Sequence, residues 1–108
     1  MCHKIESVLM NDSHLVIMNH AYKHGLTEKE IRFAWNNSLI KFSRTNDSRG
    51  EVIVAYGPAA ETALIVGVKD CVAVLGKVEE PYVFIFHASR PPLPTLIQEL
   101  EEWKRGNS

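Results

Sequence analysis

The chain has 108 residues, 45% of them hydrophobic and 23% charged, which is ordinary for one globular domain spanning residues 1–108. Its net charge of −1 excludes the strongly basic profile of a non-specific nucleic-acid binder, so an RNA site must be a local patch. The sequence has no apolar run long enough for a membrane span, and it has no secretion signal. We therefore expect a cytoplasmic chain in which Cys2 and Cys71 are free thiols.

The N-terminal part is expected to begin with a lead-in over residues 1–12 that is either poorly ordered or a partial helix. Ser13 can then cap a first helix through residues 14–24, HLVIMNHAYKH, whose apolar side chains recur at spacings of three and four. Gly25 is the natural stop, because glycine adopts a left-handed turn without steric cost.

A second helix is predicted from about residue 28 to residue 35. It is preceded by Thr27, which with Glu30 forms the sequence pattern of a capping box, and it is followed by two asparagines. The first third of the chain therefore predicts a helix-turn-helix unit.

The middle of the chain is rich in β-branched and aromatic residues, which favour strands. We predict strands at residues 38–44, 51–56, 62–69 and 82–88, and either a strand or an apolar loop at 71–78. Thr95 can cap a last helix, LIQELEEWKR, over residues 96–105. The order predicts an α+β domain with two N-terminal helices, an antiparallel sheet of about four strands and a C-terminal helix.

Three ionisable nitrogens fall together near the end of the expected first helix. His20, Lys23 and His24 have the spacing i, i+3, i+4 and would share one helix face, where they could hold a phosphate. The alternative is a solvated helix end, at which the helix dipole favours cations. His20 and His24 could also ligate zinc, but no third ligand is evident nearby, so we expect no metal and no cofactor.

His87 and Arg90 lie where the strongest predicted strand runs into a proline-rich bend. Such strand ends often carry active-site residues. A histidine can take the proton of a ribose 2′-hydroxyl while an arginine stabilises the phosphorane charge, which suits RNA cleavage. The alternative is that His87 is a satisfied edge histidine and Arg90 pairs with an acid of the last helix. We assign His24, His87 and Arg90 as catalytic, and His20, Lys23 and Arg32 as RNA- and phosphate-binding.

The segments HAYKHGLTEKEIRFAW, EVIVAYGP, ALIVGV and YVFIFHASR, in this order, resemble the BrnT-type toxins and, more broadly, the RelE-like ribonuclease toxins of bacterial toxin-antitoxin systems. The resemblance covers about residues 14–92, and its most specific part is KHGLTEKE, residues 23–30. It implies a RelE-like toxin fold, RNA as the substrate and an antitoxin protein as the partner, and it favours Lys23, His24, His87 and Arg90 as site residues.

We therefore expect the toxin of a type II toxin-antitoxin system, a ribonuclease that cleaves RNA without a metal ion. The sequence leaves open whether copies of the chain form a homo-oligomer. The rival interpretation is a non-catalytic interaction protein that keeps the toxin-like fold. It is motivated by the near-neutral charge and by the segment PPLPTLIQELEEW, which has no tyrosine where the resembling toxins carry one.

Overall fold

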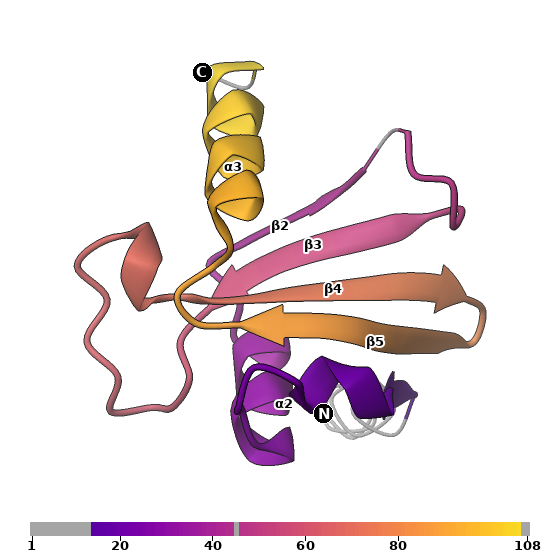
Figure 1. The fold of residues 1–108 in the computed structure, drawn as a ribbon, viewed down its shortest axis with the longest axis horizontal. Helices are drawn as coiled ribbons and strands as arrows, with labels where there is room; N and C mark the ends of the chain where they lie inside the picture. Colours follow the sequence, from indigo (N-terminus) through magenta and orange to yellow (C-terminus); the bar gives the residue numbers. More distant parts are fainter. Residues whose placement is uncertain (1–13, 45, 107–108) are drawn as a thin grey trace, which may run out of the picture.

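A five-stranded mixed sheet lies at the centre of the α+β fold (Figure 1). The computed structural model describes residues 14–44 and 46–106, so the expected lead-in at residues 1–12, the cap at Ser13 and Cys2 lie outside the described residues. The strands are β1 (Leu15–Ile17), β2 (Ile40–Ser43), β3 (Val52–Gly57), β4 (Val72–Glu79) and β5 (Tyr82–Ser89). Their order across the sheet is β1-β5-β4-β3-β2.

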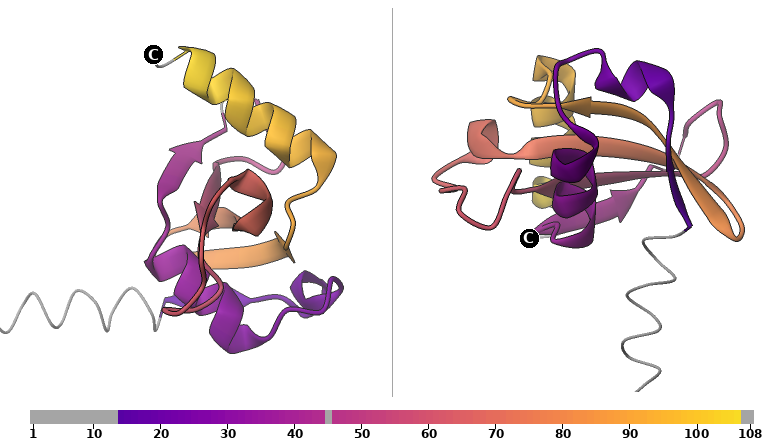
Figure 2. Two further views of the ribbon diagram at one scale, coloured as in Figure 1. Left: turned by 90° about the vertical axis from the view of Figure 1, so that its left-hand side faces the viewer. Right: turned by 90° about the horizontal axis from the view of Figure 1, so that it is seen from below.

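The two α-helices of the described residues cover opposite faces of this sheet, as the left view of Figure 2 shows. Helix α2 (Glu28–Asn36) packs on one face through Ile31, Ala34 and Trp35. Helix α3 (Pro94–Gly106) packs on the other through Leu96 and Leu100. Neither helix is long and apolar enough to cross a membrane. The sheet therefore separates two apolar cores, and each face can be discussed by the helix that covers it.

The start of α2 confirms the capping box. The Thr27 hydroxyl accepts from the amide of Glu30 at 3.1 Å, and the Glu30 carboxylate accepts from the amide of Thr27 at 2.8 Å. This signal is local, because every group in it lies within one turn. The C-terminal helix is also confirmed, with bounds one or two residues wider than expected.

The predicted first helix over residues 14–24 is wrong. Leu15–Ile17 forms β1, which pairs in parallel with β5, and only Asn19–Tyr22 is helical, as a short 3-10 helix, η1. Val16 and Ile17 are β-branched, and the exposed edge of β5 offers their backbone groups partners, so pairing overrides the helical spacing. Gly25 does end the segment in the left-handed region, with φ of 86°.

The antiparallel sheet of about four strands is confirmed by β2 to β5, and β1 adds a parallel fifth strand. The prediction of a buried strand at residues 62–69 is wrong. Leu64 and Val66 there are 79% and 83% exposed, and a second 3-10 helix, η2 (Val68–Asp70), closes the loop. Residues 71–78, for which the sequence left a strand and a loop open, contain β4, which takes the place beside β3 that a strand at 62–69 would have had as the next one in the chain.

One irregularity in the sheet decides where the candidate site lies. Leu75 of β4 pairs with His87, while the next residue, Gly76, pairs with Ile85. Phe86 is therefore an extra residue in β5, which makes a β-bulge. Ile85 packs in the α2-side core, whereas Phe86 packs against the α3-side core. The bulge places Phe86 and His87, two consecutive side chains, on the α3 side of the sheet.

Candidate functional site

His87 lies on the last part of β5, half-buried, beside the bulge. Its Nε2 is 3.1 Å from the hydroxyl oxygen of Ser89, which is two residues further along the strand and on the same face. Ser89 is 2% exposed. This hydrogen bond restrains the orientation of the imidazole. The pairing of His87 with Leu75 beside the bulge places the side chain on the α3 side of the sheet.

His24 meets His87 from a different part of the chain. The two rings are in edge-to-face contact, with centroids 5.1 Å apart and an angle of 64° between the planes. His24 reaches this position because β1 runs along β5 and η1 continues beside the same strand, as Figure 1 shows for the indigo segment. The structure thus brings together the two histidines that the sequence analysis assigned as catalytic.

A pocket of about 300 Å³ opens in front of His87 on the α3 side of the sheet. His20 lines it from η1, and Arg44 and Arg49 line it from the ends of the loop between β2 and β3. The remaining walls are mostly apolar side chains of the sheet and of the segment before α3: Leu75, Phe86, Leu93, Thr95 and Leu96. Two histidines and two arginines therefore face one small space, a composition that suits an anion.

The electrostatic environment keeps His87 uncharged near neutral pH. Burial, as the largest cause, and the positive charges of His24, Arg44, Lys23 and His20 together lower the pKa of His87 to about 4. A neutral imidazole can accept a proton, and its low pKa reflects its burial first and the neighbouring positive charges second. This is a setting in which a bound anion would stabilise the protonated ring.

Arg44 is held in place by two acids. Its Nε and Nη2 donate to the two oxygens of Glu99 on α3, at 2.9 and 3.0 Å, and its Nη1 donates to Asp47 at 2.7 Å. The hydrogen bond with Glu99 is the main reason that the pKa of Arg44 is raised. Arg49 shares Asp47, at 3.3 Å, but is 52% exposed. Arg44 is therefore a fixed positive wall of the pocket, and Arg49 is a more exposed cation beside it.

A larger pocket, of about 600 Å³, lies on the other side of Arg44 between β2 and α3. Three carboxylates line it, those of Asp47, Glu99 and Glu102, together with the stacked rings of Phe42 and Trp103, whose centroids are 5.1 Å apart. Its negative lining opposes a phosphate, so the smaller pocket at His87 is the better candidate.

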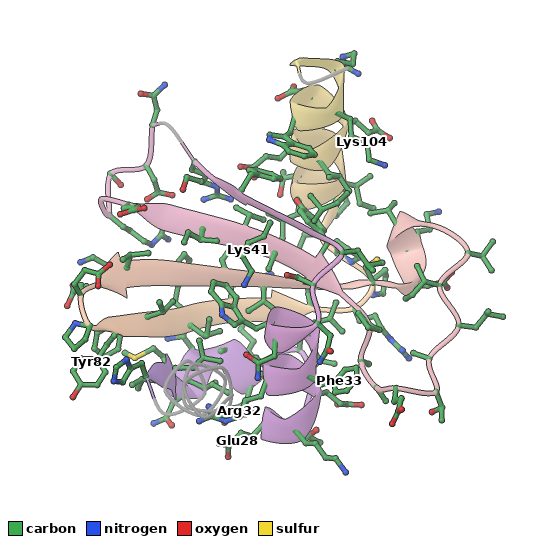
Figure 3. The ribbon with its side chains drawn as sticks, turned by 180° about the vertical axis from the view of Figure 1, so that it is seen from behind. Glu28, Arg32, Phe33, Lys41, Tyr82 and Lys104 are labelled. Atoms are coloured by element: carbon green, nitrogen blue, oxygen red, sulfur yellow. The ribbon has the colours of Figure 1, made fainter. Side chains whose placement is uncertain are left out.

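Lys23 and His20, two of the assigned phosphate-binding residues, lie close enough for their charges to act on His87. Arg32, the third, lies on α2, across the sheet from the His87 pocket, and its Nε donates to Glu28 at 2.8 Å (Figure 3). Arg90 follows β5 as an exposed residue, and after the backbone hydrogen bonds from Val66 and Gly67 its charge adds a smaller contribution to the lowered pKa of Asp70. Arg90 does not line the His87 pocket within the described residues.

Sequence reasoning missed Arg44 and Arg49. Arg44 precedes the segment TNDSRG and Arg49 is part of it, and this segment has the composition of a turn between two strands, which suggests no chemical role. The one feature of the sequence that could have indicated them is their position in a hairpin loop, because such a loop places its residues at one end of the sheet. Which sheet end lies beside His87 follows only from the strand order.

The arrangement provides a proton acceptor, a second imidazole in contact with it, and cationic side chains around a pocket. Within residues 14–44 and 46–106 no three His, Cys, Asp or Glu side chains gather as a metal site would require. Acid-base chemistry on a phosphate ester fits these groups. No family model, no curated protein and no solved structure matches this chain.

Proposed function

We propose that this chain is a ribonuclease that cleaves RNA at the His87 pocket without a metal ion. The observation that carries the proposal is the contact between the rings of His24 and His87 at 5.1 Å, with His87 neutral because its pKa is about 4. RNA contains its own nucleophile, the 2′-hydroxyl, so two imidazoles and positive charge are sufficient for the chemistry.

The reaction assigns one role to each imidazole. His87 accepts the proton of the 2′-hydroxyl, and the 2′-oxygen forms a bond to phosphorus. The bond from phosphorus to the 5′-oxygen breaks, and His24 in its protonated form supplies a proton to that leaving oxygen. The products are a 2′,3′-cyclic phosphate and a 5′-hydroxyl, and the two histidines exchange their protonation states.

The negative charge that develops on the phosphate needs a cationic environment. His20 and Arg49 line the pocket and are exposed, so they can reach a phosphate that enters from solvent. Lys23 is close enough to act on His87 electrostatically. Arg44 contributes its charge from a fixed position, since Glu99 and Asp47 hold it. Arg32 and Arg90 lie outside this group and have no role in the proposed step.

We further propose that the chain acts in the cytoplasm as the toxin of a toxin-antitoxin pair and shares the RelE-like fold. The support is the resemblance of residues 23–30 and of the strand segments, together with an α+β domain in which antiparallel strands carry the candidate site. An antitoxin protein would then have to cover the His87 pocket. Growth arrest on induced expression, absent for the His87→Ala variant, is the expected result in a bacterial host.

The direct test is cleavage of a labelled RNA by the purified chain in the presence of EDTA. We expect cyclic-phosphate products from the wild type and from His14→Ala, a control histidine that contacts Tyr82 instead of the pocket. His24→Ala and His87→Ala should each be slower by about 10²–10⁴-fold, which is the usual contribution of general acid-base catalysis. Normal cleavage by both variants would show that the assignment is wrong.

The rival function is a non-catalytic interaction protein, and one observation favours it. Leu64 and Val66 project from the loop before β4 with 79% and 83% exposure, which is unusual for two neighbouring apolar side chains. If the wild type cuts no RNA, while Leu64→Ser and Val66→Ser variants lose a partner captured by the wild type, the interaction function replaces the ribonuclease.

A further inference from the structure

The α3 side of β5 carries a second hollow beside the His87 pocket. We propose that it is a nucleobase-stacking site, and that the chain therefore takes single-stranded RNA. This inference rests on the proposed ribonuclease function, because it names the substrate class of the same site. The feature that carries it is the pair of half-buried phenylalanine rings, Phe84 and Phe86, that face this hollow.

The hollow has a volume of about 460 Å³. Phe84 and Phe86 contribute aromatic surface from β5, and Lys77 and Glu79 contribute from β4. Lys77 is the cross-strand partner of Phe84, so both side chains lie on one face of the sheet. Met18 and His20 close the hollow from the segment that follows β1. An aromatic floor with a charged rim has the composition of a surface on which a base can stack.

The face of Phe86 already holds a planar cationic group. The guanidinium carbon of Arg49 lies 4.5 Å from the centroid of Phe86, a position in which it already stacks on the ring. Tyr82 continues the aromatic row at 6.1 Å from Phe84 and is 44% exposed. Three aromatic side chains on the same face of one strand therefore form a row rather than an isolated contact.

The hollow and the His87 pocket share part of their lining. His20, Arg49 and Phe86 line both of them. A nucleotide with its base over Phe84, beside the Arg49 guanidinium on Phe86, would place its phosphate beside His20 and Arg49, in front of His87. The bulge explains this adjacency, because it presents Phe86 and His87 on the same face as consecutive residues.

The charge on the rim agrees with a nucleic-acid strand. Arg49, Lys77 and His20 face the hollow, and among the described residues that line it Glu79 is the one acid, paired with Lys77 at 2.7 Å. In a duplex the bases are already stacked and paired, so their faces cannot reach Phe84. Aromatic stacking therefore selects unpaired nucleotides.

The test measures binding of a strand that cannot be cleaved. The probe is a fluorescein-labelled oligodeoxythymidine of about six nucleotides, which lacks the 2′-hydroxyl, and its reference is an abasic deoxyribose-phosphate strand of the same length. For the wild type we expect the base-containing strand to bind at least about fivefold more tightly, since stacking on aromatic side chains gives that order of affinity per base.

The variants separate stacking from charge. Phe84→Leu should lower the affinity for the base-containing strand by at least about fivefold and leave the abasic strand unchanged, whereas Phe84→Trp should retain binding. Phe33→Leu is the matched control, because Phe33 is also half-buried but lies on α2, across the sheet (Figure 3). Equal binding of the base-containing and abasic strands, or a folded Phe84→Leu variant that binds as the wild type does, would overturn the stacking site.

A failure of the stacking site can be distinguished from a failure of the proposed ribonuclease function. Base-dependent binding lost in Phe84→Leu supports the stacking site even if the wild type cuts no RNA, in which case only the ribonuclease is rejected. RNA cleavage that depends on His87 but is unchanged in rate and in KM by Phe84→Leu keeps the ribonuclease and rejects the stacking site.

Discussion

His24 and His87 touch edge to face although they belong to segments at opposite ends of the described chain, with ring centroids 5.1 Å apart. The contact depends on two non-local features, the parallel pairing of β1 with β5 and the pairing of His87 with Leu75 of β4. A change that disturbs either feature should separate the rings without altering a histidine.

The first prediction concerns stability against pH. The pKa of His87 is about 4 in the folded chain against 6.5 as its ordinary value, so the unfolded state binds more protons between these values. The free energy of unfolding should therefore fall as the pH is lowered from about 6.5 to about 4. Urea unfolding of the wild type and of His87→Gln should show a shallower decrease for the variant. Parallel curves would show that His87 is not the group responsible.

The second prediction concerns the tie between α3 and the loop after β2. Arg44→Lys removes the two-pronged contact with Glu99, because a lysine ammonium cannot reproduce the planar fork. We expect a loss of about 1–3 kcal/mol in urea unfolding. Arg49→Lys, at an exposed position, should change it by less than about 0.5 kcal/mol. In a Glu99→Gln background the cost of Arg44→Lys should shrink, and an undiminished cost would argue against coupling of the pair.

The third prediction compares two glycines. A methyl group at Gly57 would collide with the carbonyl oxygen of Ala34 in α2, which is backbone and cannot rotate away. At Gly76 it would meet side-chain atoms of Val83 and Ile85 at 2.6 and 2.9 Å, which can adjust. Gly57→Ala should therefore lower the melting temperature more than Gly76→Ala, with costs of about 1–3 kcal/mol for overpacking. Gly67→Ala, with open space around it, is the control.

The fourth prediction concerns the hydroxyl of Tyr56. It donates to the carbonyl oxygen of Leu96 at 2.8 Å, in a buried position at the start of α3. Tyr56→Phe keeps the ring but leaves that carbonyl without this donor, so we expect a loss of about 1–3 kcal/mol in urea unfolding. Tyr82→Phe, at a 44% exposed position, should be nearly neutral. Equal losses would mean that the hydroxyl of Tyr56 contributes nothing specific.

Features encoded over a few residues could be predicted from the sequence. The capping box at Thr27, the turn at Gly25 and the aromatic strand at residues 82–88 each depend on neighbours within about one turn or one strand. Residues 14–24 could not be assigned correctly, because apolar spacings of three and four fit a helix while the segment's partner, β5, lies far away in sequence.

The apolar run at residues 62–69 is a second segment that local sequence could not assign correctly. Its composition suits a strand, but a strand needs a neighbour, and β4 already occupies the place beside β3. The 79% exposure of Leu64 is thus a result of topology. The composition of a segment shows that it could form a strand, whereas the order of the strands in the sheet decides whether it forms one.

The residue types of the candidate site could be predicted from the sequence, but only some of the residues that form it could. His24 and His87 were identified from local context, and the fold brings them together. Arg44 and Arg49 were hidden in a turn, and Arg32 is separated from the pocket by the sheet. A site made from three separate segments needs their relative placement, which no single stretch of sequence encodes.

The bulge in β5 has a consequence for engineering. Since Phe86 is the inserted position, Ile85 and His87 on either side of it pair with the consecutive residues Gly76 and Leu75. Deleting Phe86 would therefore restore strict alternation and leave His87 beside Leu75, on the same face of the sheet. The inserted residue adds an aromatic ring to that face, and its excision would remove the ring while the imidazole keeps its place.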